Sequence, residues 1–320
     1  MKKNLLLVCL ILFALTGRSQ QEALHTQFIF NKIGFNPAAA GSSEAACLTA
    51  IYRQQWIGLE GAPESQVLSF HAPLLNKRIG LGLQMQRSTV GISENFTANG
   101  MYSYRLRLGK GALGIGIQAS VRYWGMDYND PRLQATQDLS TDGGLPVGQQ
   151  QRYLPNFGTG VYYHTNRFFI GFSVPRMVNN SIDFNDLSGV LSRERRHLYF
   201  MTGLSLRLNQ YTELLPQLLL RYANHTPLSA DFNLSLQIAE RYTIGTTYRH
   251  SYHRGDRSVL GSESIDLLLS AQLTNELLFG FSYDITLSEL KDYSNGSIEG
   301  ILRYCFGKPE GQDVINPRYF

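Results

Sequence analysis

The sequence predicts an all-β protein: a transmembrane β-barrel of the outer membrane with about 14 antiparallel strands. Three observations carry this prediction. First, polar and apolar residues alternate along many segments, several of which reach the roughly ten residues that a tilted strand needs to cross a bilayer. Second, the connections between these segments are alternately short and long, as in outer-membrane barrels. Third, 12% aromatic residues and 30 glycines are combined with only 17% charged residues.

Residues 1–19 are predicted to be a secretory signal peptide. Two lysines precede an apolar run from Leu5 to Leu15, and small residues flank Arg18. The run is too short to span a bilayer as a helix. Removal of the segment lowers the formal net charge from +4 to +1, because three basic residues and no acidic ones are lost. A nearly neutral chain argues against a nucleic-acid partner.

Residues 20–44 form an N-terminal segment that contains Phe28, Phe30 and Phe35 but has no run of strand length. Two interpretations stay open. The segment folds into the lumen of the barrel as a plug, or it lies in the periplasm where a partner binds it. At the other end of the chain, residues 307–320 are expected to form a short periplasmic tail.

Residues 45–306 are predicted to form the barrel. Between Phe96 and Leu108, for example, every second residue is apolar, aromatic or small, while mostly polar residues lie between them. A soluble β-sandwich shows the same alternation, but its strands average five or six residues. In chain order, the predicted strands are 45–54, 66–72, 79–87, 94–108, 112–126, 153–164, 167–175, 195–208, 212–223, 231–239, 241–252, 261–273, 275–286 and 297–306.

The connections support this order of strands. Short ones follow the even-numbered strands, at 109–111, 165–166, 209–211 and 274–275, whereas the long ones at 127–152 and 176–194 follow odd-numbered strands. Short turns are expected on the periplasmic side and long loops on the outer side. An even number of strands returns the C-terminus to the periplasm.

Charged residues gather on the polar faces of the predicted strands, which face the lumen of a barrel. They are Arg105, Arg107, Arg122, Arg207, Arg249, Arg303, Asp231, Asp266, Asp284 and Glu299. Their mixed signs predict ion pairs that fill or restrict the interior. A wide open pore is less favoured by this pattern.

Two cysteines remain after signal removal. Cys47 lies near the start of the first strand and Cys305 near the end of the last, and these strands are neighbours in a closed barrel. A disulfide across this seam is one hypothesis, which requires the two Cα atoms to lie within about 7 Å. Two unrelated thiols are the alternative.

A series of segments in a fixed order resembles a known family. They run from Phe30 to Gly41, from Tyr52 to Pro63, from Leu68 to Pro73, from Gly171 to Pro175 and from Phe281 to Ser288. The series is similar to the PorP/SprF family of Bacteroidota outer-membrane proteins over about residues 25–306. The departures are the alanines at 38–40, where the family often has a tyrosine, and Cys305, where an acidic residue is common.

This resemblance implies a non-enzymatic barrel of the type IX secretion and gliding machinery in the cell outer membrane. One branch of the family supports export or surface anchoring of large adhesins, and another acts in general cargo secretion with periplasmic ring components. The expected partners are therefore components of the secretion machinery, secreted adhesin cargo, or both, together with outer-membrane lipid and no nucleic acid. A general diffusion porin or small-solute channel is the alternative function.

The partner-binding candidates come from the family-like segments. They are Phe30, Asn36, Pro37, Gly41, Tyr52, Arg53, Gln55, Trp56, Gly61, Ala62, Pro63, Tyr283 and Asp284. The predicted first outer loop, which contains Trp56, has two interpretations. It packs inward to close the mouth of the barrel, or it contacts secreted cargo.

No catalytic residue, cofactor or metal site is predicted. The glycines at 109, 111 and 114 match a dinucleotide fingerprint, but a strand rather than the required helix follows them. His250 and His253 face opposite sides of a strand. The Arg-Gly-Asp sequence at 254–256 is best explained as a loop turn. An outer-membrane enzyme is the weakest alternative, because no catalytic cluster can be assembled.

Overall fold

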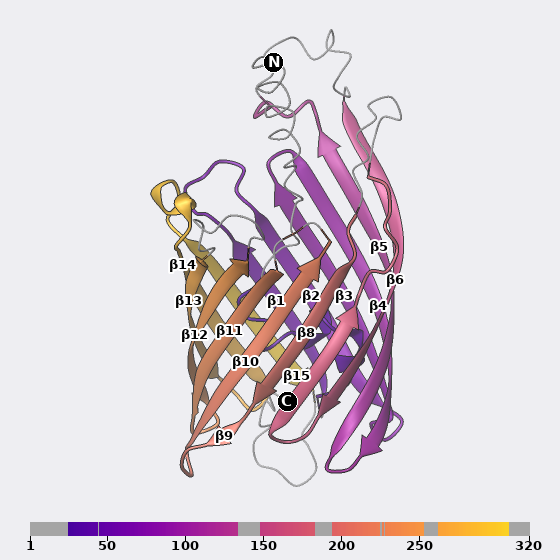
Figure 1. Cartoon of the computed structure of the whole chain (residues 1–320), viewed down its shortest axis with the longest axis vertical. Coiled ribbons are helices and arrows are strands. Elements are labelled where there is room, and N and C mark those ends of the chain that lie inside the picture. Colours follow the sequence, from indigo (N-terminus) through magenta and orange to yellow (C-terminus); the bar gives the residue numbers. More distant parts are fainter. Residues whose placement is uncertain are drawn as a thin grey trace, which may run out of the picture.

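The computed structural model describes residues 25–43, 45–133, 148–182, 194–224, 226, 228–252 and 262–306. Their strands form one antiparallel sheet that closes on itself into a barrel (Figure 1). The first strand pairs with the second and with the last, and pairing of β10 with β11 completes the ring. No helix among these residues is long and apolar enough to cross a membrane.

The strands are β1 (Ala46–Gln54), β2 (Glu64–Leu74), β3 (Ile79–Val90), β4 (Ser93–Leu108), β5 (Gly111–Asp127), β6 (Gln149–His164), β7 (Phe168–Val174), β8 (His197–Leu204), β9 (Leu206–Arg207), β10 (Thr212–Ala223), β11 (Leu228–Ile238), β12 (Tyr242–Tyr252), β13 (Ser262–Gln272), β14 (Leu277–Thr286) and β15 (Ser297–Phe306). Three short 3₁₀ helices accompany them: η1 (Lys32–Gly34), η2 (Pro37–Ala39) and η3 (Glu289–Asp292).

The described barrel has 14 strands around its circumference, as the sequence predicts. Strands β8 and β9 both pair with β10 and follow each other along it, with an interruption at Ser205, so they occupy one position in the ring. The predicted eighth strand, 195–208, is therefore correct in extent but divided. The predicted strands 212–223 and 297–306 have the observed bounds, and the others differ by a few residues at their ends.

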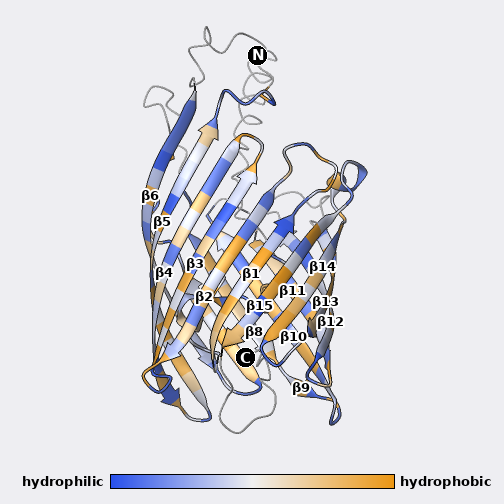
Figure 2. Cartoon of the chain, turned by 180° about the vertical axis from the view of Figure 1, so that it is seen from behind, coloured by the Kyte–Doolittle hydropathy of each residue, from blue (hydrophilic) through white to orange (hydrophobic). Residues whose placement is uncertain are grey.

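The two faces of the barrel wall are chemically opposite, as the alternation predicts. On β3, the side chains of Leu83 and Met85 are 58% and 50% exposed, whereas Gln84 between them is 5% exposed. Figure 2 shows hydrophobic and hydrophilic residues alternating along the strands. The outer face thus suits contact with lipid acyl chains, and the inner face carries polar side chains into the lumen.

The wall is taller on one side. Strands β4, β5 and β6 contain 16, 17 and 16 residues, while the remaining strands have at most 12. Because about ten residues cross a bilayer, the additional residues extend beyond it. They rise at the end of the barrel that carries the long connections (Figure 1), and the tip of β6 there is hydrophilic (Figure 2).

The N-terminal segment, residues 25–43, lies inside the barrel. Its apolar side chains are almost completely buried, with Phe28 2%, Ile29 1% and Phe30 4% exposed. They form one hydrophobic cluster with inward-facing residues of the wall, including an edge-to-face contact between Phe35 and Tyr199 at 5.7 Å. We call residues 25–41 the plug.

A charge on the outer face is expected to destabilise the barrel. Leu267 lies at the middle of β13 and is 52% exposed, so Leu267→Arg places a guanidinium in the hydrocarbon at a cost of about 2–4 kcal/mol. The free energy of unfolding in lipid vesicles, measured by urea titration, tests this expectation. Tyr293→Arg, in the exposed loop after η3, is the matched control and should leave the midpoint unchanged. Equal shifts in both variants would contradict the assigned outer face.

Candidate functional site

The first end of the plug is held by carboxylates of the wall. The backbone N–H groups of Thr26 and Gln27 donate to the two oxygens of Glu299, at 3.0 Å and 2.7 Å. The Thr26 hydroxyl lies 3.0 Å from both Asp266 Oδ2 and Asp284 Oδ1, so it can donate to either one. Strands β13, β14 and β15 each supply one of these acids.

Arg53 of β1 pairs with two of these acids. Its guanidinium pairs with Glu299 at 3.1 Å and with Asp284, and it donates to the Thr26 hydroxyl at 3.0 Å. Arg53 is 1% exposed and Glu299 is fully buried. The ion pair therefore binds the first, penultimate and last strands to the plug at one point.

The network continues around the wall through two further arginines. Arg249 of β12 pairs with Asp231 at 3.1 Å and with Asp266 at 3.3 Å. Arg221 of β10 pairs with the same Asp231 at 2.8 Å. All of these groups are at most 8% exposed, and such pairs tolerate burial because each charge faces an opposite one.

The second end of the plug fits against glycines of the wall. A Cβ atom added to Gly114 would lie 2.6 Å from the carbonyl oxygen of Ala38, and one added to Gly171 would lie 2.8 Å from the Asn36 amide nitrogen. Three more positions would overlap the plug in the same way: Gly80, Gly116 and Gly160. These five glycines, on β3, β5, β6 and β7, form what we call the glycine socket.

Polar groups complete the socket. Asn36 accepts from Ala38 N–H at 2.9 Å, which caps η2, and donates to the carbonyl of Val161 at 2.9 Å. The Ser103 hydroxyl donates to the Ala38 carbonyl at 3.0 Å. Arg105 donates to the Gly41 carbonyl, where the chain turns out of the plug with a positive φ of 69°.

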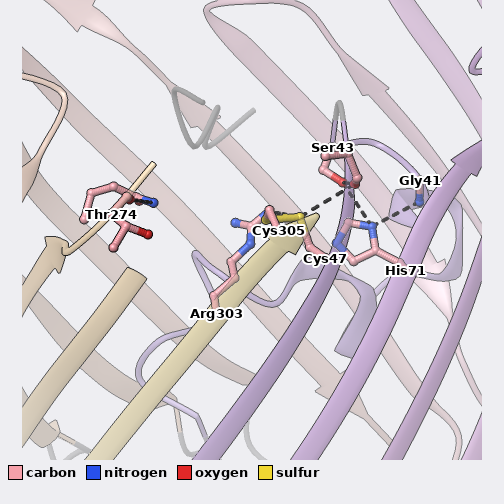
Figure 3. The surroundings of a disulfide bond; sticks show 9 residues. Gly41, Ser43, Cys47, His71, Thr274, Arg303 and Cys305 are labelled. Atoms are coloured by element: carbon pink, nitrogen blue, oxygen red, sulfur yellow. Dashed lines mark hydrogen bonds between the residues drawn. A yellow bond between two sulfur atoms is a disulfide. The ribbon is translucent and has the colours of Figure 1, made fainter. Parts of the chain in front are cut away.

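A disulfide joins Cys47 to Cys305 at the seam between β1 and β15 (Figure 3). The two residues are direct partners in the strand register, with their Cα atoms 4.0 Å apart. Arg303 donates to Cys47 Sγ at 3.6 Å. The bond lies just after the plug in the chain, so it fixes β1, the strand that follows the plug.

The β1–β2 loop, residues 55–63, is tied to its neighbours at the long-loop end of the barrel. Ile57 exchanges backbone hydrogen bonds with Asn295 and Gly296 of the β14–β15 loop, both at 2.8 Å. Gly91, in the β3–β4 turn, donates to the Gly61 carbonyl at 2.8 Å. Trp56 is half-buried and has a positive φ of 49°. The loop is therefore a fixed part of the rim.

The structure divides the predicted partner-binding residues into three groups. Those inside the barrel are Phe30, Asn36, Pro37, Gly41, Arg53 and Asp284. Those on the rim are Gln55, Trp56, Gly61, Ala62 and Pro63. Tyr52 and Tyr283 are instead on the outer face, 43% and 39% exposed, and are not brought together with the others.

Most of the predicted lumenal charges lie in the lumen, but two do not. Arg107 and Arg207 are exposed at the short-turn ends of their strands, because the polar face of a strand reaches water again where the strand leaves the barrel. Arg207 pairs there with Glu213 at 3.1 Å.

Some participating residues were not found from the sequence. Glu194 was assigned to a long connection, yet it is 6% exposed and pairs with Arg122 at 3.0 Å and Arg176 at 3.6 Å. Thr26 and Gln27 carry no recognisable motif, since much of their contribution comes from backbone N–H groups. Only the approach of β13, β14 and β15 to the plug reveals them.

The remaining motifs have simple structural outcomes. Gly109 has a φ of +57° and lies in the tight turn between β4 and β5, and a strand follows it as expected. Within the described ranges, no group of three His, Cys, Asp or Glu side chains could hold a metal ion. His253 and the sequence at 254–256 lie outside the described residues.

A closed 14-stranded wall with an apolar outer face and a filled polar lumen defines an outer-membrane β-barrel protein. The chain belongs to the PorP/SprF family of type IX secretion system membrane proteins, whose family model matches residues 17–304. The protein is thus located in the outer membrane.

Solved structures support the fold. The chain is similar to the monoaromatic hydrocarbon channel CymD, with 13% identity and a TM-score of 0.50 over 89% of this chain and 94% of that one. It is similar also to the toluene transporter TbuX of Ralstonia pickettii, with 10% identity and a TM-score of 0.50 over 87% and 94%. No match was found among curated proteins.

Loss of Arg53 is expected to destabilise the protein strongly. Arg53→Ala removes the guanidinium from the buried Glu299 and leaves Asp284 only its longer contact with Arg249 at 3.8 Å, which costs about 3–5 kcal/mol. Urea unfolding in lipid vesicles measures the change in the free energy of unfolding. Arg87→Ala is the control, because its pair with Glu94 is half exposed (47% and 49%) and such pairs contribute at most about 1 kcal/mol. Similar losses of unfolding free energy in the two variants would mean that water screens the ion pairs of the lumen.

Proposed function

We propose that this protein is a non-enzymatic, permanently plugged barrel that supports export or surface anchoring of proteins secreted by the type IX system, such as adhesins. The proposal rests on membership of the family and on one structural observation. The lumen, which a diffusion porin would leave open to solutes, is occupied by the chain's own plug.

The contacts of the plug favour a permanent part of the barrel over a gate. Its first end satisfies buried carboxylates, so withdrawing it would leave Asp266, Asp284 and Glu299 with only Arg53 and Arg249 for compensation. Leaving a buried polar group without its partner costs about 1–3 kcal/mol, and more for a charged group. The glycine socket adds close packing at the other end.

A barrel that does not conduct can still act through its surfaces. The rim at the long-loop end offers the β1–β2 loop, whose backbone is fixed by hydrogen bonds to two neighbouring loops. A fixed loop loses little conformational entropy on binding. We therefore propose that Gln55, Trp56 and residues 61–63 contact cargo or machinery.

The charges of the lumen favour a structural role over a catalytic one. Arg53, Arg221 and Arg249 each face a carboxylate, and the carboxylates also hold the plug. A catalytic group needs a free position beside it for substrate. These contacts support the proposal that the protein is not an enzyme.

Conductance separates the plugged barrel from the porin alternative. The purified protein should give no conductance steps in planar bilayers, whereas a variant that lacks residues 25–41 should give steady open-channel steps because the plug is gone. If the deletion variant does not fold, Gly116→Leu serves in its place, since its side chain occupies the position of Ala38. Open-channel steps of equal size in the wild-type protein and the variant would favour the porin alternative.

The cellular role is tested by the surface and supernatant proteomes of a strain that lacks the gene. Loss of one large adhesin would identify a dedicated partner, and retention of all type IX cargo inside the cell would identify a general component. Complementation with Trp56→Ala should fail to restore the lost proteins, while the control Tyr293→Ala, on a different rim loop, should restore them. Normal secretion with reduced solute uptake would overturn the proposal.

A further inference from the structure

The short-turn end of the barrel has an excess of positive charge. We count the turns and the two strand residues next to each of them, within the described residues. Five turns carry seven basic residues: Lys77 and Arg78; Arg107 and Lys110; Arg167; Arg207; and Arg241. Only two acidic residues lie in these five turns, Glu213 and Glu240, and the sixth short turn, between β13 and β14, carries Glu276. We call this set of turns the basic rim.

The opposite end of the barrel has a different balance. Within the described residues, the same count at this end gives nine acidic residues against six basic ones. The acidic residues are Glu60, Glu64, Glu94, Asp127, Asp130, Glu194, Glu263, Glu289 and Asp292, and the basic ones are Arg53, Arg132, Arg176, Arg195, Arg196 and Lys291. The excess of basic residues is therefore particular to the short-turn end, which is expected to face the periplasm.

The basic residues follow the barrel wall from β2 to β12 instead of forming one patch. The five turns join β2 to β3, β4 to β5, β6 to β7, β9 to β10 and β11 to β12, which follow one another around the ring. A protein partner would contact one side of this ring, whereas membrane lipid surrounds a barrel on all sides. The distribution thus favours lipid.

Outward-facing aromatic side chains lie at the same end. Tyr104, Tyr211 and Tyr242 are 44%, 63% and 50% exposed, and the Arg241 guanidinium lies over the Tyr242 ring at 5.8 Å. Aromatic rings mark the level of lipid headgroups in membrane proteins. Basic side chains at that level are placed to meet phosphate groups.

We propose that the basic rim binds anionic phospholipid of the periplasmic leaflet. The arginine and lysine side chains contact the headgroup phosphates, and the acyl chains lie against the apolar outer face above them. The inference depends on the barrel fold and not on the proposed role in secretion, so either one can fail without the other.

The test compares two triple variants of the full-length protein. Arg78→Gln, Lys110→Gln and Arg167→Gln together remove charge from three turns of the basic rim, on exposed side chains. The control variant carries Arg152→Gln, Arg195→Gln and Lys291→Gln, which remove the same charge at the long-loop end. Heat-dependent migration in gels first shows that both variants fold.

The readout is the lipid retained by the protein in native mass spectra after exposure to equal amounts of phosphatidylglycerol and phosphatidylcholine. The wild-type protein and the control variant should retain phosphatidylglycerol about fivefold over phosphatidylcholine, as expected for about 1 kcal/mol per basic contact. The rim variant should retain the two lipids about equally.

Two results would overturn the proposal. One is equal retention of the two lipids by the wild-type protein. The other is an equal loss of preference in both variants, which would mean that net charge and not position decides. If the wild-type protein shows no lipid preference but an acidic periplasmic protein co-purifies with it and not with the rim variant, the basic rim is a protein-binding surface and the lipid proposal is wrong.

Discussion

The contact between Glu299 and the start of the plug is the interaction on which the rest of the interior depends. One carboxylate accepts from two backbone N–H groups of the plug and pairs with Arg53 of the first strand. A buried carboxylate without these partners would be strongly unfavourable, and the plug backbone would lose two acceptors. The wall and the plug therefore satisfy each other, and neither is complete alone.

The two ends of the plug are held by different kinds of interaction. At the charged end, ion pairs and hydrogen bonds in a water-free interior stabilise the plug. A single substitution there should lower the free energy of unfolding strongly. At the glycine socket, the energy comes from close packing, which is possible because the wall lacks side chains where Asn36 and Ala38 lie. The combination explains why a short segment with two brief 3₁₀ helices keeps one position inside a wide barrel.

Much of the fold could be predicted from the sequence. Alternation along segments such as 94–108 determines which face is outside, and this pattern depends only on residue order. The division of the predicted strand 195–208 into β8 and β9 at Ser205 is not predictable, since the alternation continues across it. The charge pattern indicated a filled lumen through Arg249 and Asp266, but it mis-assigned Arg107, because sequence alone does not show where a strand leaves the barrel.

The candidate site was less predictable for a physical reason. Candidates such as Asn36 and Arg53 follow from a family resemblance, but the sequence does not decide whether the N-terminal segment lies inside or outside the barrel. Its position depends on backbone groups of Thr26 and Gln27 and on glycines of four distant strands, and none of these has a local signature. Glu194 was missed in the same way, since a carboxylate in a long connection looks exposed until its arginine partners are in place.

The disulfide between Cys47 and Cys305 has a consequence for how the barrel can open. It connects the first and last strands, which become neighbours only when the sheet has closed. Complete separation of these two strands therefore requires cleavage of a covalent bond as well as loss of their backbone hydrogen bonds. Residues 47–305 form one covalently closed loop, and the plug precedes this loop in the chain.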